Sequence, residues 1–195
     1  MPLTTVQQGL IAQNDFAKFL MIGGGGLVEI AAPMTDDEGR DGEIHKRGEY
    51  SYGIAGQFKS TGHLSRRKGR PERLLEVRFS RPARLVVNDP RYWYFIGYLD
   101  LKQMGLADPV FVVPSAVFHK EARQKKVGDV VFFRFRANMD PSSKDKWQRY
   151  RVQTHQLGKR VLEIMADLEK EENRKRLLLS GPITGPGTML LRKAT

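Results

Sequence analysis

Residues 39–61 read GRDGEIHKRGEYSYGIAGQFKST, and this stretch decides the fold. Its alternating pattern around a central Arg-Gly pair predicts two short antiparallel strands, residues 42–46 and 50–59, joined by a turn. Asp41 comes immediately before the first strand. The hairpin therefore brings an acidic side chain to the same edge of a sheet as the far end of the second strand.

The second strand carries a Gln-x-Lys pattern, Gln57-Phe58-Lys59. Side chains two positions apart on a strand point to the same face, so Gln57 and Lys59 project together while Phe58 points into a core. An acid, a carbonyl-bearing side chain and an ammonium group at one sheet edge can hold a divalent metal and a phosphate. This arrangement favours a phosphodiesterase, and specifically a nuclease.

The bulk composition favours a globular protein that binds a polyanion. The chain has 195 residues, 40% of them hydrophobic, and a formal net charge of +11. Such an excess of cations is typical of proteins that bind nucleic acid, although it also serves simple solubility. No apolar run approaches the ~20 residues of a membrane span, so no membrane partner is expected. The chain has no cysteine, which excludes disulfides and thiolate metal sites and fits a reducing cytoplasm.

Helical and strand patterns alternate along the rest of the chain. A helix capped by Thr4 or Thr5 is expected to run to about Ile22, with an inward stripe made by Val6, Leu10, Ala17 and Leu20. Strands are expected at residues 27–32, 74–79, 83–87, 92–99, 110–113, 130–136 and 149–154, and helices at 115–125 and 158–179. This order predicts an α/β fold, with a mixed central sheet flanked by helices and with C-terminal strand and helix additions.

The predicted chemistry is metal-dependent hydrolysis. Magnesium prefers oxygen ligands, and one or two carboxylates with waters and substrate oxygens suffice to hold it. Asp41 is the first candidate ligand, followed by the Gln57 side chain and the Phe58 backbone carbonyl. Lys59 is then the candidate that orients the attacking water or stabilises the phosphorane. Each residue also has a purely structural interpretation, such as a turn acid for Asp41 or a surface strand lysine for Lys59.

This layout resembles the PD-(D/E)XK nuclease superfamily, which has the restriction-endonuclease-like fold. The family pattern is an acid, a variable spacer and then acid-x-Lys on the neighbouring strand, preceded by a helix. More closely, the chain is similar to a branch whose final motif is Gln-x-Lys, over about residues 5–120. The resemblance implies a Mg2+- or Mn2+-dependent endonuclease with Asp41, Gln57 and Lys59 as catalytic residues.

Two positions depart from the family pattern. Gln57 replaces the usual acid, and Gln13 stands where the helix of many members carries a glutamate. The departures predict weaker metal binding, with Gln13 and Glu43 as accessory residues. Two alternatives therefore stay open: a nuclease-like protein that binds nucleic acid without cutting it, and an interaction protein that forms an oligomer, such as a homodimer, through the helix at 158–179 and the tail.

A basic loop follows the Gln-x-Lys motif and is the candidate phosphate-contacting segment. Its cations are Arg66, Arg67, Lys68, Arg70 and Arg73. Such residues contribute affinity for the DNA backbone but read no sequence. We expect one nuclease-like domain over residues 1–180, with a core at about 5–125, an extension at about 126–180 and a tail at 181–195. A DNA endonuclease of phage, mobile-element or defence origin is the predicted function.

Overall fold

The computed structural model describes residues 3–32, 40–66 and 73–179. Its helices and strands are, in chain order, α1 (Thr5–Gly23), β1 (Val28–Ala31), β2 (Gly42–Lys46), β3 (Glu49–Thr61), β4 (Leu64–Arg66), β5 (Arg73–Pro82), β6 (Tyr92–Asp100), β7 (Gly105–Pro114), α2 (Ser115–Glu121), β8 (Arg123–Val127), β9 (Val130–Asn138), β10 (Arg151–Val152) and α3 (Leu157–Leu179). Short 3-10 turns lie at Ala83–Leu85, Gln148–Tyr150 and Thr154–Gln156.

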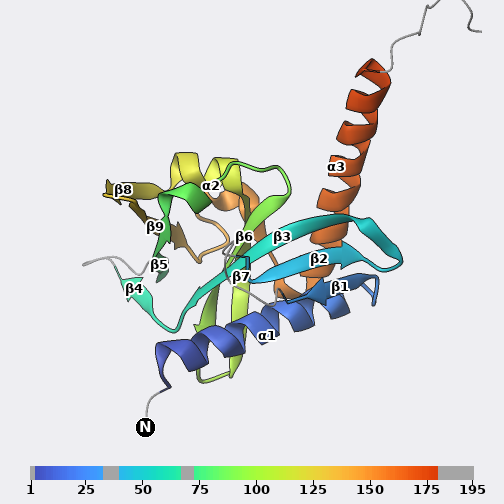
Figure 1. The fold of residues 1–195 in the computed structure, drawn as a ribbon. Helices are drawn as coiled ribbons and strands as arrows, with labels where there is room; N and C mark the ends of the chain where they lie inside the picture. Colours follow the sequence, from blue (N-terminus) through green and yellow to red (C-terminus); the bar gives the residue numbers. More distant parts are fainter. Residues whose placement is uncertain (1–2, 33–39, 67–72, 180–195) are drawn as a thin grey trace, which may run out of the picture.

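Two sheets make up the body of the molecule. The six-stranded sheet has the order β1-β2-β3-β6-β7-β10, and the four-stranded sheet has the order β4-β5-β9-β8. The pairing of β3 with β6 is parallel and the other pairings are antiparallel, so the six-stranded sheet is mixed. The predicted hairpin is confirmed as β2 and β3, with Gly42 opposite Gly56. Figure 1 shows the six-stranded sheet lying between α1 with α3 on one side and the four-stranded sheet on the other.

Helix α1 covers one face of the six-stranded sheet. A capping box begins it: the Thr4 hydroxyl accepts from the Gln7 amide, while the Gln7 side chain accepts from the Thr4 amide. Its buried stripe is Ala12, Phe16 and Leu20 with Asp15 beside them. The expected stripe was wrong at its first half, because Val6 is 82% exposed and Leu10 is 59% exposed.

Helix α3 packs across α1 at a contact made by glycines. A Cβ built on Gly158 would lie 2.1 Å from the backbone nitrogen of Gly24 and 2.1 Å from the backbone oxygen of Leu20. The two backbones can approach this closely because position 158 has no side chain. Val161, Ile164 and Met165 then continue into the core beneath the sheet. The later turns of α3 project beyond the sheets (Figure 1).

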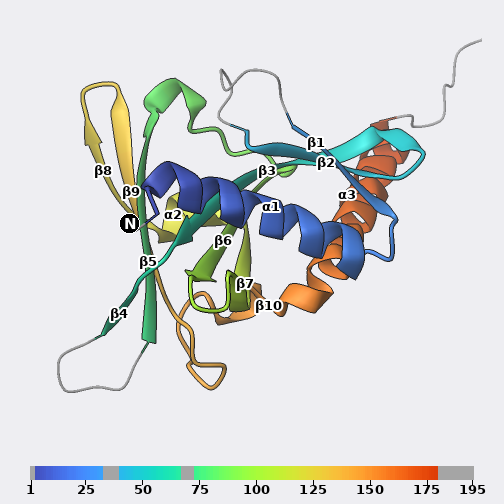
Figure 2. The ribbon, with the colours of Figure 1, turned by 90° about the horizontal axis from the view of Figure 1, so that it is seen from below.

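The four-stranded sheet packs on the other face of the six-stranded sheet. Its inward residues on β5 and β9 include Val77, Phe133 and Phe135, which meet Tyr94 and Phe111 of the larger sheet. Phe118 of α2 and Trp147 fill the same core and are almost fully buried. Figure 2 shows β5, β9 and β8 standing side by side at the end of the molecule away from α3. The predicted C-terminal strand and helix additions are therefore present.

Several predicted elements were wrong in type or length, among them the strand expected at 110–113, which runs over Gly105–Pro114. Residues 83–87 were expected as a strand but begin with a 3-10 turn, Ala83–Leu85, because Pro82 ends β5 there. The helix expected at 115–125 stops at Glu121, and the next residues pair with β9 as β8. The strand expected at 149–154 is reduced to Arg151–Val152 between two 3-10 turns. The proposed tail, 181–195, lies outside the described residues, and the domain limits stay a prediction.

Candidate active site

The Asp41 carboxylate lies at the start of the β2–β3 hairpin and is held by its backbone. The Asp41 amide donates to the Gly56 carbonyl at 2.9 Å, which extends the strand ladder by one residue. Its Oδ2 accepts from the Phe58 amide at 2.7 Å and lies 3.4 Å from the Lys59 ammonium. Both side chains are about one quarter exposed. The hairpin therefore brings an acid, a backbone amide and an ammonium group together at a surface that solvent reaches.

The two accessory candidates lie on either side of Asp41. Gln13 projects from α1, and its side-chain amide donates to the Asp41 backbone carbonyl at 2.9 Å. This contact fixes the position of the hairpin's first residue against the helix. Glu43 lies one strand repeat further along β2, where its carboxylate is 2.7 Å from Arg40 and 3.6 Å from His45. Gln13 is thus placed to support Asp41, while Glu43 is engaged with two basic neighbours.

Gln57 is 5% exposed and belongs to a buried polar network. Its Oε1 accepts from Arg81 at 3.0 Å and from the Tyr92 hydroxyl at 3.1 Å. Arg81 lies on β5 of the other sheet, is 4% exposed, and also donates to Tyr92 and Tyr94. The carbonyl oxygen predicted as a metal ligand therefore takes two hydrogen bonds from the protein. A buried guanidinium group lies directly behind the Gln-x-Lys motif.

The network continues away from Gln57 through Tyr94 and His119. The Tyr94 hydroxyl is 2.9 Å from His119 Nε2, and His119 Nδ1 is 2.7 Å from the Asn88 side-chain oxygen. Burial and the Arg81 cation lower the pKa of His119 to about 4, so the imidazole is neutral at pH 7. Burial raises the pKa of Tyr92 and Tyr94, which keeps both phenols protonated. The network thus arranges neutral hydrogen-bonding groups around the Arg81 cation.

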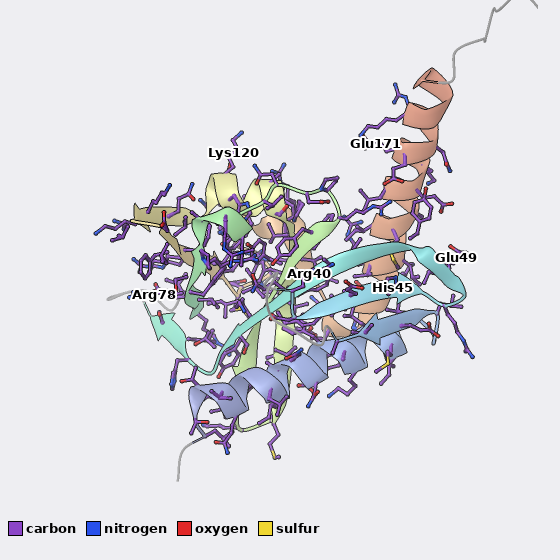
Figure 3. The ribbon with its side chains drawn as sticks, viewed as in Figure 1. Arg40, His45, Glu49, Arg78, Lys120 and Glu171 are labelled. Atoms are coloured by element: carbon purple, nitrogen blue, oxygen red, sulfur yellow. The ribbon has the colours of Figure 1, made fainter. Side chains whose placement is uncertain are left out.

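A groove of about 490 Å³ runs beside this network. It lies between the β2–β3 hairpin and the segment that follows β5, and its polar lining includes Arg40, His45, Arg81, Arg91 and Asp89. Arg40 and His45 lie along the hairpin side (Figure 3). Arg81 lines the groove and also contacts Gln57, so the groove adjoins the Asp41 and Lys59 site. Three of these side chains carry guanidinium groups, which bind phosphate oxygens well.

The basic loop is described only at its ends. Arg67, Lys68 and Arg70 lie outside the described residues, and Arg66 closes strand β4. Arg73 begins β5 and is exposed. The predicted role of this loop in binding phosphate stays a prediction.

Arg81 is a site residue that the sequence patterns did not single out. A signal was present, because Val77, Phe79 and Arg81 alternate along one strand and the first two face a core. That periodicity places Arg81 on the inner face, where a charge needs partners. Lys59 also meets this strand, since its ammonium lies 5.7 Å from the centre of the Phe79 ring. The four-stranded sheet thus supplies one wall of the site.

The structure places Asp41 and Lys59 at one edge of a hairpin within a mixed sheet that helices flank. The chain resembles the solved structure of a bacterial homing endonuclease, I-Ssp6803I, with a TM-score of 0.51 and 16% identity. The likeness covers 86% of this chain and 98% of that one. It concerns the fold and is consistent with the predicted restriction-endonuclease-like core. No protein-family model and no curated protein sequence matches the chain. Within the described residues, no helix is long and apolar enough to cross a membrane.

Proposed function

We propose that the protein is a metal-dependent nuclease that hydrolyses phosphodiester bonds in DNA. The observation that carries the proposal is the contact of one Asp41 oxygen with both the Phe58 amide and the Lys59 ammonium. These groups lie beside a groove lined by three arginines, in a chain of net charge +11. The nuclease fold of the structural neighbour supports the same reaction class.

The donor groups at Asp41 fit a magnesium or manganese ion. In a strand, the amide and carbonyl of one residue point to the same side. The Phe58 amide points at Asp41, so its carbonyl is directed toward the same edge, beyond the end of β2. Asp41 and the Phe58 carbonyl would hold the ion, with water and substrate oxygens completing its shell. When bound, the ion supplies a Lewis acid and a water of lowered pKa.

Two cations of the chain stabilise the reacting phosphate in this proposal. Lys59 lies next to Asp41 and either orients the attacking water or stabilises the phosphorane as a point charge. Arg81 keeps Gln57 in place and brings a second positive charge to the same wall of the groove. A neutral glutamine at position 57 suits this arrangement, because its oxygen accepts from Arg81 without neutralising that charge.

The test is a cleavage assay with linear, branched and single-stranded DNA in magnesium or manganese. Asp41→Asn should abolish cleavage, and Lys59→Ala should lower kcat by about 100- to 1,000-fold, as expected when one group that stabilises developing charge is lost. The matched control is Lys46→Ala with Glu49→Gln, an exposed ion pair at the turn of the same hairpin. The proposal is wrong if the Asp41 and Lys59 variants cut as well as this control.

The second candidate is a nuclease-like protein that binds nucleic acid without cutting it. It is favoured by the engagement of the Gln57 oxygen with Arg81 and Tyr92. A second observation also favours it: among the described residues, no three His, Asp or Glu side chains lie close enough together to hold a metal ion. Salt-sensitive DNA binding with no cleavage in any divalent metal would select this candidate over the first.

A further inference from the structure

The outer side of the four-stranded sheet is a basic surface separate from the candidate active site. Strand alternation turns Val77, Phe133 and Phe135 inward, and it turns the intervening side chains outward. The outward cations come from three adjacent strands and are Arg78, Arg123, Lys125, Arg134 and Arg136. We call this set the outer basic face. Figure 3 shows Arg78 at the end of the molecule away from α3.

The Glu76 carboxylate lies among these cations. Glu76 is 2.6 Å from Arg134, and Arg78 and Arg136 also approach it. The hydrogen bond from Arg134 and the second one from Arg78 lower the pKa of Glu76, so it remains charged. Glu76 offsets one of the five positive charges, and the nearby Glu121 is paired with Lys146, so the outer basic face remains strongly positive. Glu76 lies within 4 Å of three of these arginines and so links β5 to β9 across the face.

An exposed aromatic side chain lies within the outer basic face. Phe132 is 48% exposed and lies between Ser80 of β5 and Lys125 of β8 in the strand register. It lines a shallow groove of about 680 Å³ together with Arg78, Lys125 and Arg134. A large apolar ring surrounded by cations is the composition that suits base edges flanked by phosphates, since phenylalanine contacts the thymine methyl group.

The shape and chemistry of this surface select the class of nucleic acid. Proteins that hold single strands stack successive bases on several aromatic rings. Phe132 is alone among five cations here, so interactions with phosphate dominate. The cations are carried by three adjacent strands, about 10 Å across from β5 to β8, which is close to the major-groove width of about 12 Å and suits contact with the phosphates on both sides of that groove. These properties fit duplex DNA better than a single strand.

We propose that the outer basic face is a docking surface for duplex DNA. It lies on the opposite side of β5 from Arg81, so it contacts DNA beyond the phosphate that is cut. The inference rests on the proposed function for the identity of the substrate alone, because binding at this face requires no catalysis. The four-stranded sheet then has two roles: its inner side forms a wall of the candidate active site, and its outer side holds flanking DNA.

The test measures binding of a labelled 30-base-pair duplex by fluorescence anisotropy, in EDTA and over a series of salt concentrations. The variant is Arg123→Ala with Lys125→Ala and Arg136→Ala, three exposed positions of the face. The matched control is Lys159→Ala with Arg174→Ala and Lys175→Ala, which removes the same charge from exposed positions on α3. Thermal unfolding of both variants checks that each remains folded.

The face variant should bind more weakly by about 10-fold to about 500-fold at 0.1 M salt. The slope of log K against log salt is negative, and it should become less steep by about 2.7. This change is about 0.9 for each of the three phosphates that the variant no longer neutralises. The affinity of the control should fall by less than about threefold. Any of four results would overturn the proposal: an equal decrease in affinity in both variants, unchanged binding by the face variant, no duplex binding by the wild type, or a decrease confined to single-stranded DNA or RNA.

The same proteins separate this inference from the proposed nuclease activity. If the wild type binds duplex DNA through the face but never cuts it, the docking surface stands and the nuclease proposal fails. If the wild type cuts DNA in an Asp41-dependent way while the face variant binds normally, the nuclease proposal stands and the docking surface fails.

Discussion

Arg81→Met should destabilise the protein through the network behind Gln57. The substitution keeps much of the side-chain volume and removes the guanidinium group of a residue that is only 4% exposed. Three oxygen atoms lie within hydrogen-bonding distance of its Nη1 and share the two hydrogens of that atom: Gln57 Oε1 at 3.0 Å, the Tyr94 hydroxyl at 3.2 Å and the Tyr92 hydroxyl. All three would lose a charge-assisted donor.

The expected cost follows from which acceptors keep another partner. A hydrogen bond to a charged group contributes roughly 1.5–3 kcal/mol, which would give a large sum for three bonds. Gln57 keeps its bond from Tyr92, and Tyr94 keeps His119, so neither is left alone. Removing a buried cation also recovers part of its desolvation cost. We therefore expect a net loss of about 3 kcal/mol, which lowers Tm by roughly 6–12 °C for a chain of this size.

The measurement is urea and thermal unfolding of the wild type, Arg81→Met and the control Arg84→Met. Arg84 lies three residues away in the 3-10 turn and is exposed, so its substitution should change stability by less than about 0.5 kcal/mol. If the two variants unfold alike, or if Arg81→Met is more stable than the wild type, the reasoning fails. The desolvation cost of the buried cation would then exceed its hydrogen bonds.

Three further predictions concern packing, pH and metal. Gly158→Ala should lower the unfolding free energy by about 2 kcal/mol or more, because its Cβ would lie 2.1 Å from the α1 backbone. The control Gly9→Ala meets nothing within 4 Å and should be neutral or stabilising. Equal urea midpoints for the two variants would contradict this prediction. The pKa of about 4 for folded His119 lies below the unfolded value of about 6.5, so the unfolded state binds the extra proton first and stability should fall as pH drops from about 7 to 4. His119→Gln should flatten that decline, and an unchanged dependence of the urea midpoint on pH would refute the assignment. EDTA should abolish cleavage and added magnesium or manganese should restore it, while activity that persists after exhaustive dialysis against EDTA would exclude the proposed metal site.

The hairpin and the pairing of Asp41 with Lys59 were predictable because they depend on short-range patterns. The period-2 alternation of the two strands and the Gln-x-Lys spacing set which side chains share a face. Fifteen residues separate Asp41 from Gln57, and a single hairpin register brings them together. The α/β class was likewise predictable from the order of the patterns, and the structure confirms it.

The contacts of Gln57 were not predictable from local pattern. Its partners Arg81 and Tyr92 come from strands of two different sheets, and they meet only after the sheets pack together. The error at α1 has a similar cause. Leu20 was expected in the buried stripe and is buried, but which turns of a helix lie over the sheet depends on its position along the sheet, so the first turns with Val6 and Leu10 stay exposed.

Parallel β3 and β6 are joined by a long connection, residues 62–91, and that connection itself supplies β4 and β5 of the other sheet. The hairpin of β2 and β3 joins neighbouring residues, whereas the pairing of β3 with β6 must close a loop of about 30 residues, which slows its formation. The contact of Asp41 with Lys59 therefore depends on the hairpin alone. Arg81 can reach Gln57 only when the crossover places β5 against the larger sheet, so this side of the candidate site depends on long-range packing.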